Sequence, residues 1–210
     1  MKRRNRNRGL QRLEVRDRSP RLYFIATEDT YAPQQYFDSF RIPQLKFIWL
    51  ETTDGYSAPQ HVLTRLSDAL DEGSRFDPES GDECWLLLDV DRWTRSNNIS
   101  TFSDVITVAM QKGYLYAISN PSFEIWLLLH LRELKDSDFA TLKTCKRVRK
   151  EIVALVGQYC KTNIGDSYAD LKNVRLAYER SKAMDTGDRW PQATGTQIYK
   201  LIDSLGVIDV

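Results

Sequence analysis

Four acidic residues have types and spacing suited to binding a metal ion: Glu28, Asp89, Asp91 and Glu124. Each comes at or soon after the end of an apolar segment. In an extended segment, residues i and i+2 project to the same side, so Asp89 and Asp91 are expected to point together. Carboxylates that lie close together repel one another unless a counter-ion is present. Oxygen ligands of this kind suit a hard divalent cation, Mg²⁺ or Mn²⁺.

Each of these acids also has a structural interpretation. A single acid can cap a helix or pair with an arginine, and Glu124 in the first turn of a helix gains from the helix dipole. An Asp-x-Asp directly after a buried strand favours the metal interpretation. His130 lies six residues after Glu124 on the same expected helix and is a candidate base or phosphate contact. The alternative for His130 is a hydrogen-bonded histidine in the core.

The elements that must position these residues alternate between strand and helix. Apolar runs predict strands, and helical spacing with Pro or Ser/Thr at the start predicts helices between them. This alternation is typical of an α/β fold with a mostly parallel sheet, in which ligands bind at the carboxyl ends of the strands. The predicted strands are 22–26, 47–50, 84–88 and 114–118, and the predicted helices begin near Pro33 and cover 58–71, 102–112 and 122–134.

The final 75 residues have a different pattern. They show helical spacing over 139–159, 166–185 and 194–205 and no convincing strand. We expect a helical C-terminal extension packed on the sheet, and a separate helical subdomain is the alternative. The predicted organisation is therefore a basic arm over 1–20, an α/β domain over 21–134 and a helical extension over 135–210.

The charge is distributed unevenly along the 210 residues. Residues 1–21 contain nine Lys/Arg and two acids, a balance of +7, so the net charge of +1 leaves −6 for the rest. A basic arm of this kind, which includes Arg3 and Arg4, favours contact with phosphates or with an acidic protein surface, and a solvated terminus is the alternative. A second basic run contains five bases and no acid: Lys143, Lys146, Arg147, Arg149 and Lys150.

Composition excludes several classes of protein. Hydrophobic residues make up 41% of the chain, enough for a packed core. No apolar run approaches the roughly 18–20 residues of a membrane span, and the polar start lacks the pattern of a secretory signal. The three cysteines form no Cys-x-x-Cys pair and indicate neither a disulfide framework nor a zinc site. We therefore expect a cytoplasmic protein.

Three known arrangements place acids at such strand ends. Haloacid-dehalogenase-like phosphatases carry Asp-x-Asp-x-Thr/Val on their first strand, whereas here the motif comes third and is followed by Trp93. Receiver domains use an acid pair after the first strand and an aspartate after the third, but have no need of Asp91. The Toprim fold has a glutamate after the first strand and Asp-x-Asp after the third, and resembles this sequence best.

The sequence resembles the RloB-like family, Toprim-related proteins of bacterial anti-phage loci. The segment 119–130, Ser-Asn-Pro-Ser-Phe-Glu-Ile-Trp-Leu-Leu-Leu-His, is similar to the family's Ser-Asn-Pro-x-Phe-Glu-x-Trp-Leu-Leu-His signature. The strand ending in Asp89-Val90-Asp91 resembles the family's Asp-Arg-Asp, and Glu28 with Tyr36-Phe37 resembles its opening motif. The sequence departs from the family pattern at three places: Asp29 replaces a Gly, Ala32-Pro33 replaces a Thr-Glu pair, and Val90 replaces the usual Arg.

The resemblance implies a Mg²⁺-dependent nuclease subunit that works beside an ABC-type ATPase. Glu28, Asp89, Asp91 and Glu124 would hold one or two ions, which activate water and stabilise charge on the scissile phosphate. Lys161 and Arg92 are candidate cations for the developing negative charge. Lys146, Arg147 and Lys150, with the N-terminal arm, are candidates to contact the backbone of RNA, including transfer RNA, or of DNA. A non-catalytic nucleic-acid-binding or scaffold subunit is the alternative, and a homo-oligomer remains open.

Overall fold

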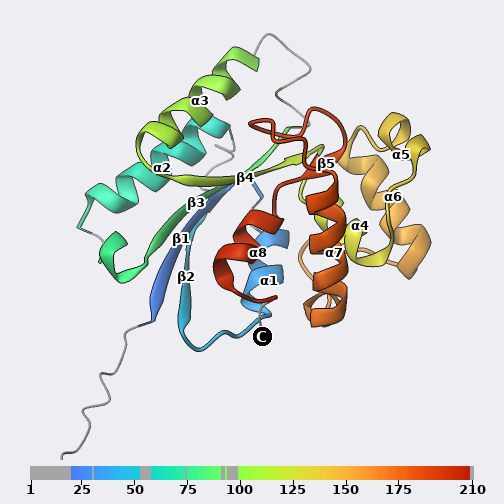
Figure 1. Ribbon diagram of the computed structural model, residues 1–210, viewed down its shortest axis with the longest axis horizontal. Coiled ribbons are helices and arrows are strands. Elements are labelled where there is room, and N and C mark those ends of the chain that lie inside the picture. The colour runs from blue at the N-terminus through green and yellow to red at the C-terminus, as the bar shows by residue number, and fades with distance from the viewer. Residues whose placement is uncertain are drawn as a thin grey trace, which may run out of the picture.

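The protein has an α/β fold in which helices flank a five-stranded sheet (Figure 1). This computed structural model describes residues 20–29, 31–52, 58–73, 75–90, 93 and 99–208. The strand order is β2-β1-β3-β4-β5; the first four strands are parallel and β5 is antiparallel to β4. The predicted α/β fold with a mostly parallel sheet is therefore confirmed. The strands are β1 (Arg21–Thr27), β2 (Leu45–Leu50), β3 (Glu83–Asp89), β4 (Leu115–Asn120) and β5 (Gly195–Thr196).

Both faces of the sheet are covered, because alternate strand residues enter two separate cores. Phe24 and Ala26 of β1 pack under α2 (Pro59–Asp71) and α3 (Ile99–Gln111). Tyr23 and Ile25 point to the opposite face. The helices on that face are α1 (Ala32–Asp38), α4 (Glu124–Leu131), α7 (Leu171–Ala183) and α8 (Tyr199–Leu205), as Figure 1 shows. Strands buried on both sides explain the continuous apolar runs in the sequence.

Helix α4 is the central helix of the second core. All its residues from Glu124 to His130 are buried, as its apolar composition on every side requires. It packs against α7 and against α6 (Cys145–Val156), and so lies between the sheet and the C-terminal helices. Within the described ranges, the helices are all too short or too polar to cross a membrane.

The C-terminal extension differs in detail from the prediction. The helix expected over 139–159 is two helices, α5 (Asp136–Thr141) and α6, because the Thr144 hydroxyl accepts a hydrogen bond from the Arg147 N–H at 3.3 Å and caps α6. Short 3-10 turns also occur at Pro78–Ser80 and Asp166–Ala169. The predicted boundary between 134 and 135 falls between α4 and α5. Val148 of the extension shares a core with the β1 face, so the extension packs on the sheet domain.

The prediction that the last 75 residues contain no strand was wrong. Gly195 and Thr196 form β5, with Thr196 opposite Ser119 and Gly195 opposite Asn120. The hydroxyls of Ser119 and Thr196 lie 2.7 Å apart. A two-residue strand has no alternating pattern to recognise, and its pairing depends on contacts with β4. This strand extends the sheet beside the end of β4, where Figure 1 shows the chain returning from α7.

Candidate metal and catalytic site

The carboxyl ends of β1, β3 and β4 meet at one rim of the sheet because these strands are parallel. Thr27, the last residue of β1, pairs with Leu87, and Asp89 at the end of β3 pairs with Ser119 of β4. Glu28 follows β1 directly, and Glu124 begins the helix after β4. The fold therefore brings three of the four predicted metal-binding acids to the same edge.

The side chain of Glu28, which follows β1, accepts hydrogen bonds from the end of β3 and from Trp93 beyond it. Its Oε1 accepts a hydrogen bond from the backbone N–H of Asp89 at 3.2 Å, and its Oε2 accepts one from the indole N–H of Trp93 at 3.2 Å. Its own N–H donates to the Leu87 carbonyl at 3.4 Å. These contacts fix the direction in which the carboxylate points across the rim.

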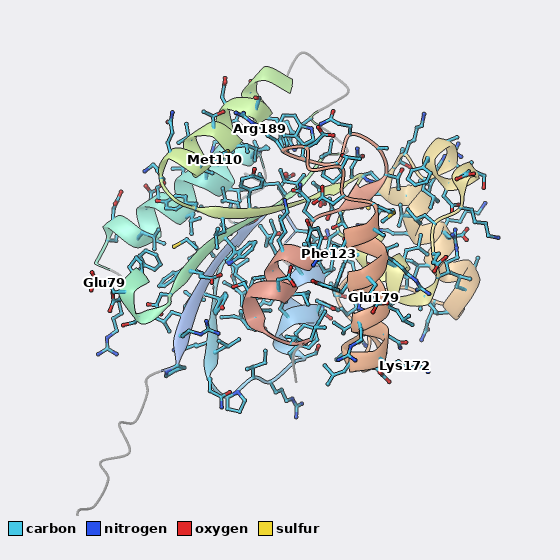
Figure 2. All side chains as sticks on the ribbon, in the orientation of Figure 1. Glu79, Met110, Phe123, Lys172, Glu179 and Arg189 are labelled. Carbon is cyan, nitrogen blue, oxygen red and sulfur yellow. The ribbon has the colours of Figure 1, made fainter. Side chains whose placement is uncertain are left out.

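The negative charge of Asp89 is strongly disfavoured at the rim. Burial, followed by the nearby charges of Glu28, Glu124 and Asp29, raises the pKa of Asp89 well above its usual range. A hydrogen bond from the Phe123 N–H to Oδ1, at 3.0 Å, acts in the opposite direction. Phe123 lies in the interior of the molecule, at the turn into α4 (Figure 2). An ionised Asp89 therefore requires a positive charge beside it.

Glu124 already has such a charge. This side chain is 1% exposed, and its Oε1 accepts hydrogen bonds from Arg149 Nε at 2.7 Å and the Tyr159 hydroxyl at 3.2 Å, with Arg149 Nη2 at 2.6 Å. Its Oε2 accepts from the Ser122 hydroxyl at 2.7 Å and the Cys145 thiol at 3.4 Å. Burial alone raises the pKa of Glu124, but Ser122 and Arg149 outweigh it and hold the pKa below its ordinary value. Glu124 is ionised and surrounded by donors.

Asp29 is the fourth acid of the rim and was not among the predicted site residues. Its Oδ2 lies 2.8 Å from the Lys161 Nζ, and its Oδ1 accepts a hydrogen bond from the Tyr31 N–H at 3.0 Å. The side chain of Asp29 is almost fully buried, whereas that of Lys161 is about one-third exposed. Lys161, predicted as a catalytic cation, is thus brought to the rim from the loop after α6.

His130 lies in the core, in an aromatic cluster with Tyr36, Trp126 and Tyr168. Its Nε2 is 3.1 Å from the Tyr36 hydroxyl, and its Nδ1 is 2.8 Å from the Trp126 carbonyl oxygen. Burial lowers its pKa to about 4, so the ring is neutral at pH 7. The structure shows the buried, hydrogen-bonded histidine that was the alternative to a catalytic base, and gives no geometric support for the predicted catalytic role.

The predicted nucleic-acid contacts are only partly described. Arg3, Arg4 and Arg92 lie outside the described residues, as does the predicted metal ligand Asp91. The structure describes the basic residues of α6, and their side chains point in two different directions. Lys146, Arg147 and Lys150 are exposed, whereas Arg149 turns inward to Glu124. Cys145, Arg149 and Ile152 share one helix face by spacing, a signal that could have separated Arg149 from its neighbours.

Arg65 is a further rim residue that sequence reasoning missed. It comes from α2, and its Nη2 donates to the Thr27 carbonyl at 3.0 Å and to the Thr52 hydroxyl at 3.2 Å. Burial lowers the pKa of Arg65, while the nearby charge of Glu28 acts in the opposite direction. Its position follows from the strand order, because β2 lies beside β1 and the helix after β2 returns over the end of β1.

The carboxylate oxygens at the rim are ligands of the type that a hard divalent cation prefers. Glu28 and Asp89 offer carboxylate oxygens, and Asp89 lies among like charges that a cation would neutralise. A cavity of about 10 Å³, enough for about one water molecule, is lined by Asp29, Asp89 and Ser119 among others. Within the described part of the chain, no three His, Cys, Asp or Glu residues are grouped closely enough to hold an ion. Asp91 would have to complete the set.

The fold and the rim together define an α/β protein whose acids converge at the carboxyl ends of parallel strands. A protein-family model described as RloB-like protein matches residues 23–205, and the chain belongs to the RloB-like family. The suspected family is therefore confirmed. No curated protein and no solved structure matches the chain.

Proposed function

We propose that this protein is a Mg²⁺- or Mn²⁺-dependent nuclease, the effector subunit of an anti-phage defence system with an ABC-type ATPase partner. The observation that carries the proposal is Asp89, whose carboxylate lies among the charges of Glu28, Asp29 and Glu124 at the strand rim. Structural acids are normally paired with cations, as Glu124 is with Arg149. A carboxylate held among like charges is typical of a functional site.

In this proposal, different residues of the chain hold the cation and attract the phosphate. Glu28, Asp89 and Asp91 would hold the cation, and the Phe123 N–H keeps the Asp89 carboxylate oriented toward the rim. When bound, the cation would supply an activated water and stabilise the charge of the scissile phosphate. Lys161, which is partly exposed beside Asp29, would attract a phosphate to the rim.

The exposed bases of α6 supply the sequence-independent part of substrate binding in this proposal. Lys146, Arg147 and Lys150 point to solvent from a helix whose inner face meets the rim through Arg149. Phosphate contacts of this kind do not distinguish one sequence from another, so RNA, including transfer RNA, and DNA are both substrates to test. The cytoplasm is the compartment in which such substrates and an ATPase partner would meet the protein.

A scaffold subunit without activity is the second candidate function. It is favoured by one observation, that no three described acids or other ligands are grouped closely enough for an ion. In this alternative, the acids of the rim serve only to dock the C-terminal extension, as Glu124 does.

The double variant Asp89→Asn/Asp91→Asn separates these two functions. The protein is co-expressed with the ATPase of its locus, and the complex is isolated by size-exclusion chromatography, which also reports any homo-oligomer. Each complex is then incubated with cellular RNA or plasmid DNA in Mg²⁺ and ATP. Loss of cleavage with an intact complex supports the nuclease. An active double variant, or loss of assembly without any cleavage by the wild type, would support the scaffold.

A further inference from the structure

Two hollows adjoin one another on the surface of the C-terminal extension, at the carboxyl end of α7. The first, of about 400 Å³, lies between the end of α4 and α7 and is lined in part by Leu176 and Met184. The second, of about 410 Å³, lies between α5 and the segment from α7 to β5, and is lined in part by Phe139 and Pro191. Ala183 and Met184 line both hollows, so the two form one groove, which we call the α7 groove.

The floor of the α7 groove is apolar and reaches solvent. Leu176 and Ala183 lie seven residues apart on one side of α7, which is about 10 Å along the helix axis. Ala183 is exposed, and Leu134, Leu176 and Met184 are half-buried. The small side chain of Ala183 leaves open the junction between the two hollows. A second protein surface that covered this floor would remove apolar area from water, which favours association.

Acidic side chains stand at the mouth of the α7 groove. Glu133 and Glu179 come from the two elements that border the first hollow; the Glu133 side chain is 79% exposed, and Glu179 is exposed on α7 (Figure 2). Asp188 is an exposed acid of the second hollow. Asp185, the fourth acid of the lining, accepts hydrogen bonds from within the protein. The mouth therefore presents exposed carboxylates along both hollows.

Positive charge at the α7 groove is small and turned inward. Arg180 is the one base among the described residues that line the two hollows. Its side chain is 19% exposed, its Nη1 donates to the Leu129 carbonyl at 2.6 Å, and its Nε lies 3.9 Å from Glu133 Oε1. Because α7 ends at Ala183, the negative end of its dipole also lies at the groove. An apolar floor is thus combined with an electronegative mouth.

We propose that the α7 groove binds an amphipathic helix of a partner protein, with apolar side chains toward the floor and Lys or Arg on its flanks. The floor matches the apolar face of such a helix, and Glu133, Glu179 and Asp188 match its cations. A small-molecule site would have polar groups that converge inside the pocket, whereas these carboxylates are exposed at the mouth. The inference goes beyond the proposed function and does not depend on nuclease activity.

Two designed peptides test the α7 groove on the full-length protein. The first probe is a fluorescent helical peptide of about four turns, with leucines three and four residues apart on one face and lysines on the flanks. The second has glutamate in place of each lysine. Binding is measured by fluorescence anisotropy at low and high salt. We expect the lysine peptide to bind at least about tenfold more tightly than the glutamate peptide, and added salt to reduce this difference.

Variants of the lining locate the bound peptide. Ala183→Arg fills the junction of the two hollows with a long cation and should weaken binding of the lysine peptide at least about tenfold. Glu133→Lys/Glu179→Lys should weaken the lysine peptide and strengthen the glutamate peptide. The matched control is Glu72→Lys/Glu79→Lys, which makes the same change of charge at exposed acids outside the lining and should keep the wild-type affinity (Figure 2). Circular dichroism verifies that each variant is folded.

Equal binding of the two peptides by the wild type, or unchanged binding by a folded Ala183→Arg variant, would overturn the inference. Two other occupants of the groove give distinct results. A dimer of the wild type that Ala183→Arg dissociates would assign the groove to a second copy. Binding of the lysine peptide that appears only when the arginines of residues 1–21 are replaced by glutamine would assign it to the chain's own basic arm. Either result would overturn the assignment to a partner helix.

Discussion

The carboxylate of Glu28 accepts a hydrogen bond from the backbone N–H of Asp89, with 3.2 Å between Oε1 and N. The two residues are 61 positions apart in the chain and lie at the ends of neighbouring parallel strands. The side chain of one proposed ligand thus fixes the backbone of the other. A change at Glu28 should alter the position of Asp89, so Asp89 is the cleaner residue for testing the site.

Asp89→Asn should stabilise the protein in the absence of metal. The pKa of Asp89 is raised in the folded state, so folding favours its protonated form, and stability is lost as the pH rises from the unfolded pKa through the folded one. Asparagine removes this charge and keeps an oxygen for the Phe123 N–H. At pH 7 the variant should therefore melt higher than the wild type in EDTA.

Added Mg²⁺ should reverse that order. Millimolar Mg²⁺ should raise the melting temperature of the wild type, because ligands that bind only the folded state stabilise it. It should leave the melting temperature of Asp89→Asn unchanged. Equal shifts in the two proteins would show that the ion binds elsewhere.

His130 should make stability depend on pH in the acidic range. Burial lowers its pKa to about 4 from 6.5, so between these values the unfolded chain binds a proton that the folded chain does not. Stability is therefore full above pH 6.5 and should fall by about 3 kcal/mol by pH 4. Urea unfolding of the wild type and His130→Gln at pH 7, 5.5 and 4 isolates this contribution. Parallel pH profiles for the two proteins would refute it.

Arg132 should stabilise the junction of α4, α5 and α6. Its Nη1 lies 2.6 Å from Asp138 Oδ2 and its Nη2 lies 2.8 Å from Glu151 Oε1, and the Arg132 and Asp138 side chains are mostly buried. Arg132→Met should lower the free energy of unfolding by about 2 kcal/mol, since it removes the cation that two carboxylates share. Mn²⁺ binding should not change, because these contacts lie outside the rim. A loss of metal affinity would contradict this separation.

The exposed bases of α6 should contribute to nucleic-acid affinity in a salt-dependent way. The triple variant Lys146→Gln/Arg147→Gln/Lys150→Gln should weaken binding to RNA and DNA regardless of sequence. It should reduce the slope of log K against log salt by about 3 if each base contacts one phosphate. Fluorescence anisotropy with Lys172→Gln as the control measures this slope. An unchanged slope would contradict a contact between these bases and the phosphates of the nucleic acid.

Local sequence patterns predicted most of the strands but not the order of the strands in the sheet. The strand expected over 84–88 is observed at Glu83–Asp89, and the helix expected over 58–71 is Pro59–Asp71. Burial on both faces left a continuous apolar run for β3, which is a strong local signal. The position of β1 between β2 and β3, and the pairing of β5, depend on contacts between distant residues.

The acids of the site were recognisable, whereas their partners were not. Glu28, Asp89 and Glu124 stand at strand ends or the start of a helix, and the parallel sheet brings strand ends together. Arg149 and Arg65 reach the rim from helices whose placement follows from tertiary packing. The sequence therefore predicted the same role for Glu124 and Asp89. In the structure, hydrogen-bond donors surround Glu124, whereas Asp89 lies among like charges.

The most direct test of the proposed function is the rate at which the protein, together with the proposed ATPase partner, cleaves end-labelled RNA and DNA. Wild type and Asp89→Asn are compared in Mg²⁺ and in EDTA under single-turnover conditions. We predict cleavage by the wild type in Mg²⁺ alone and a rate at least about 100-fold lower for Asp89→Asn, since a proposed ligand is lost. Cleavage at equal rates by the two proteins, or cleavage that persists in EDTA, would contradict the proposal.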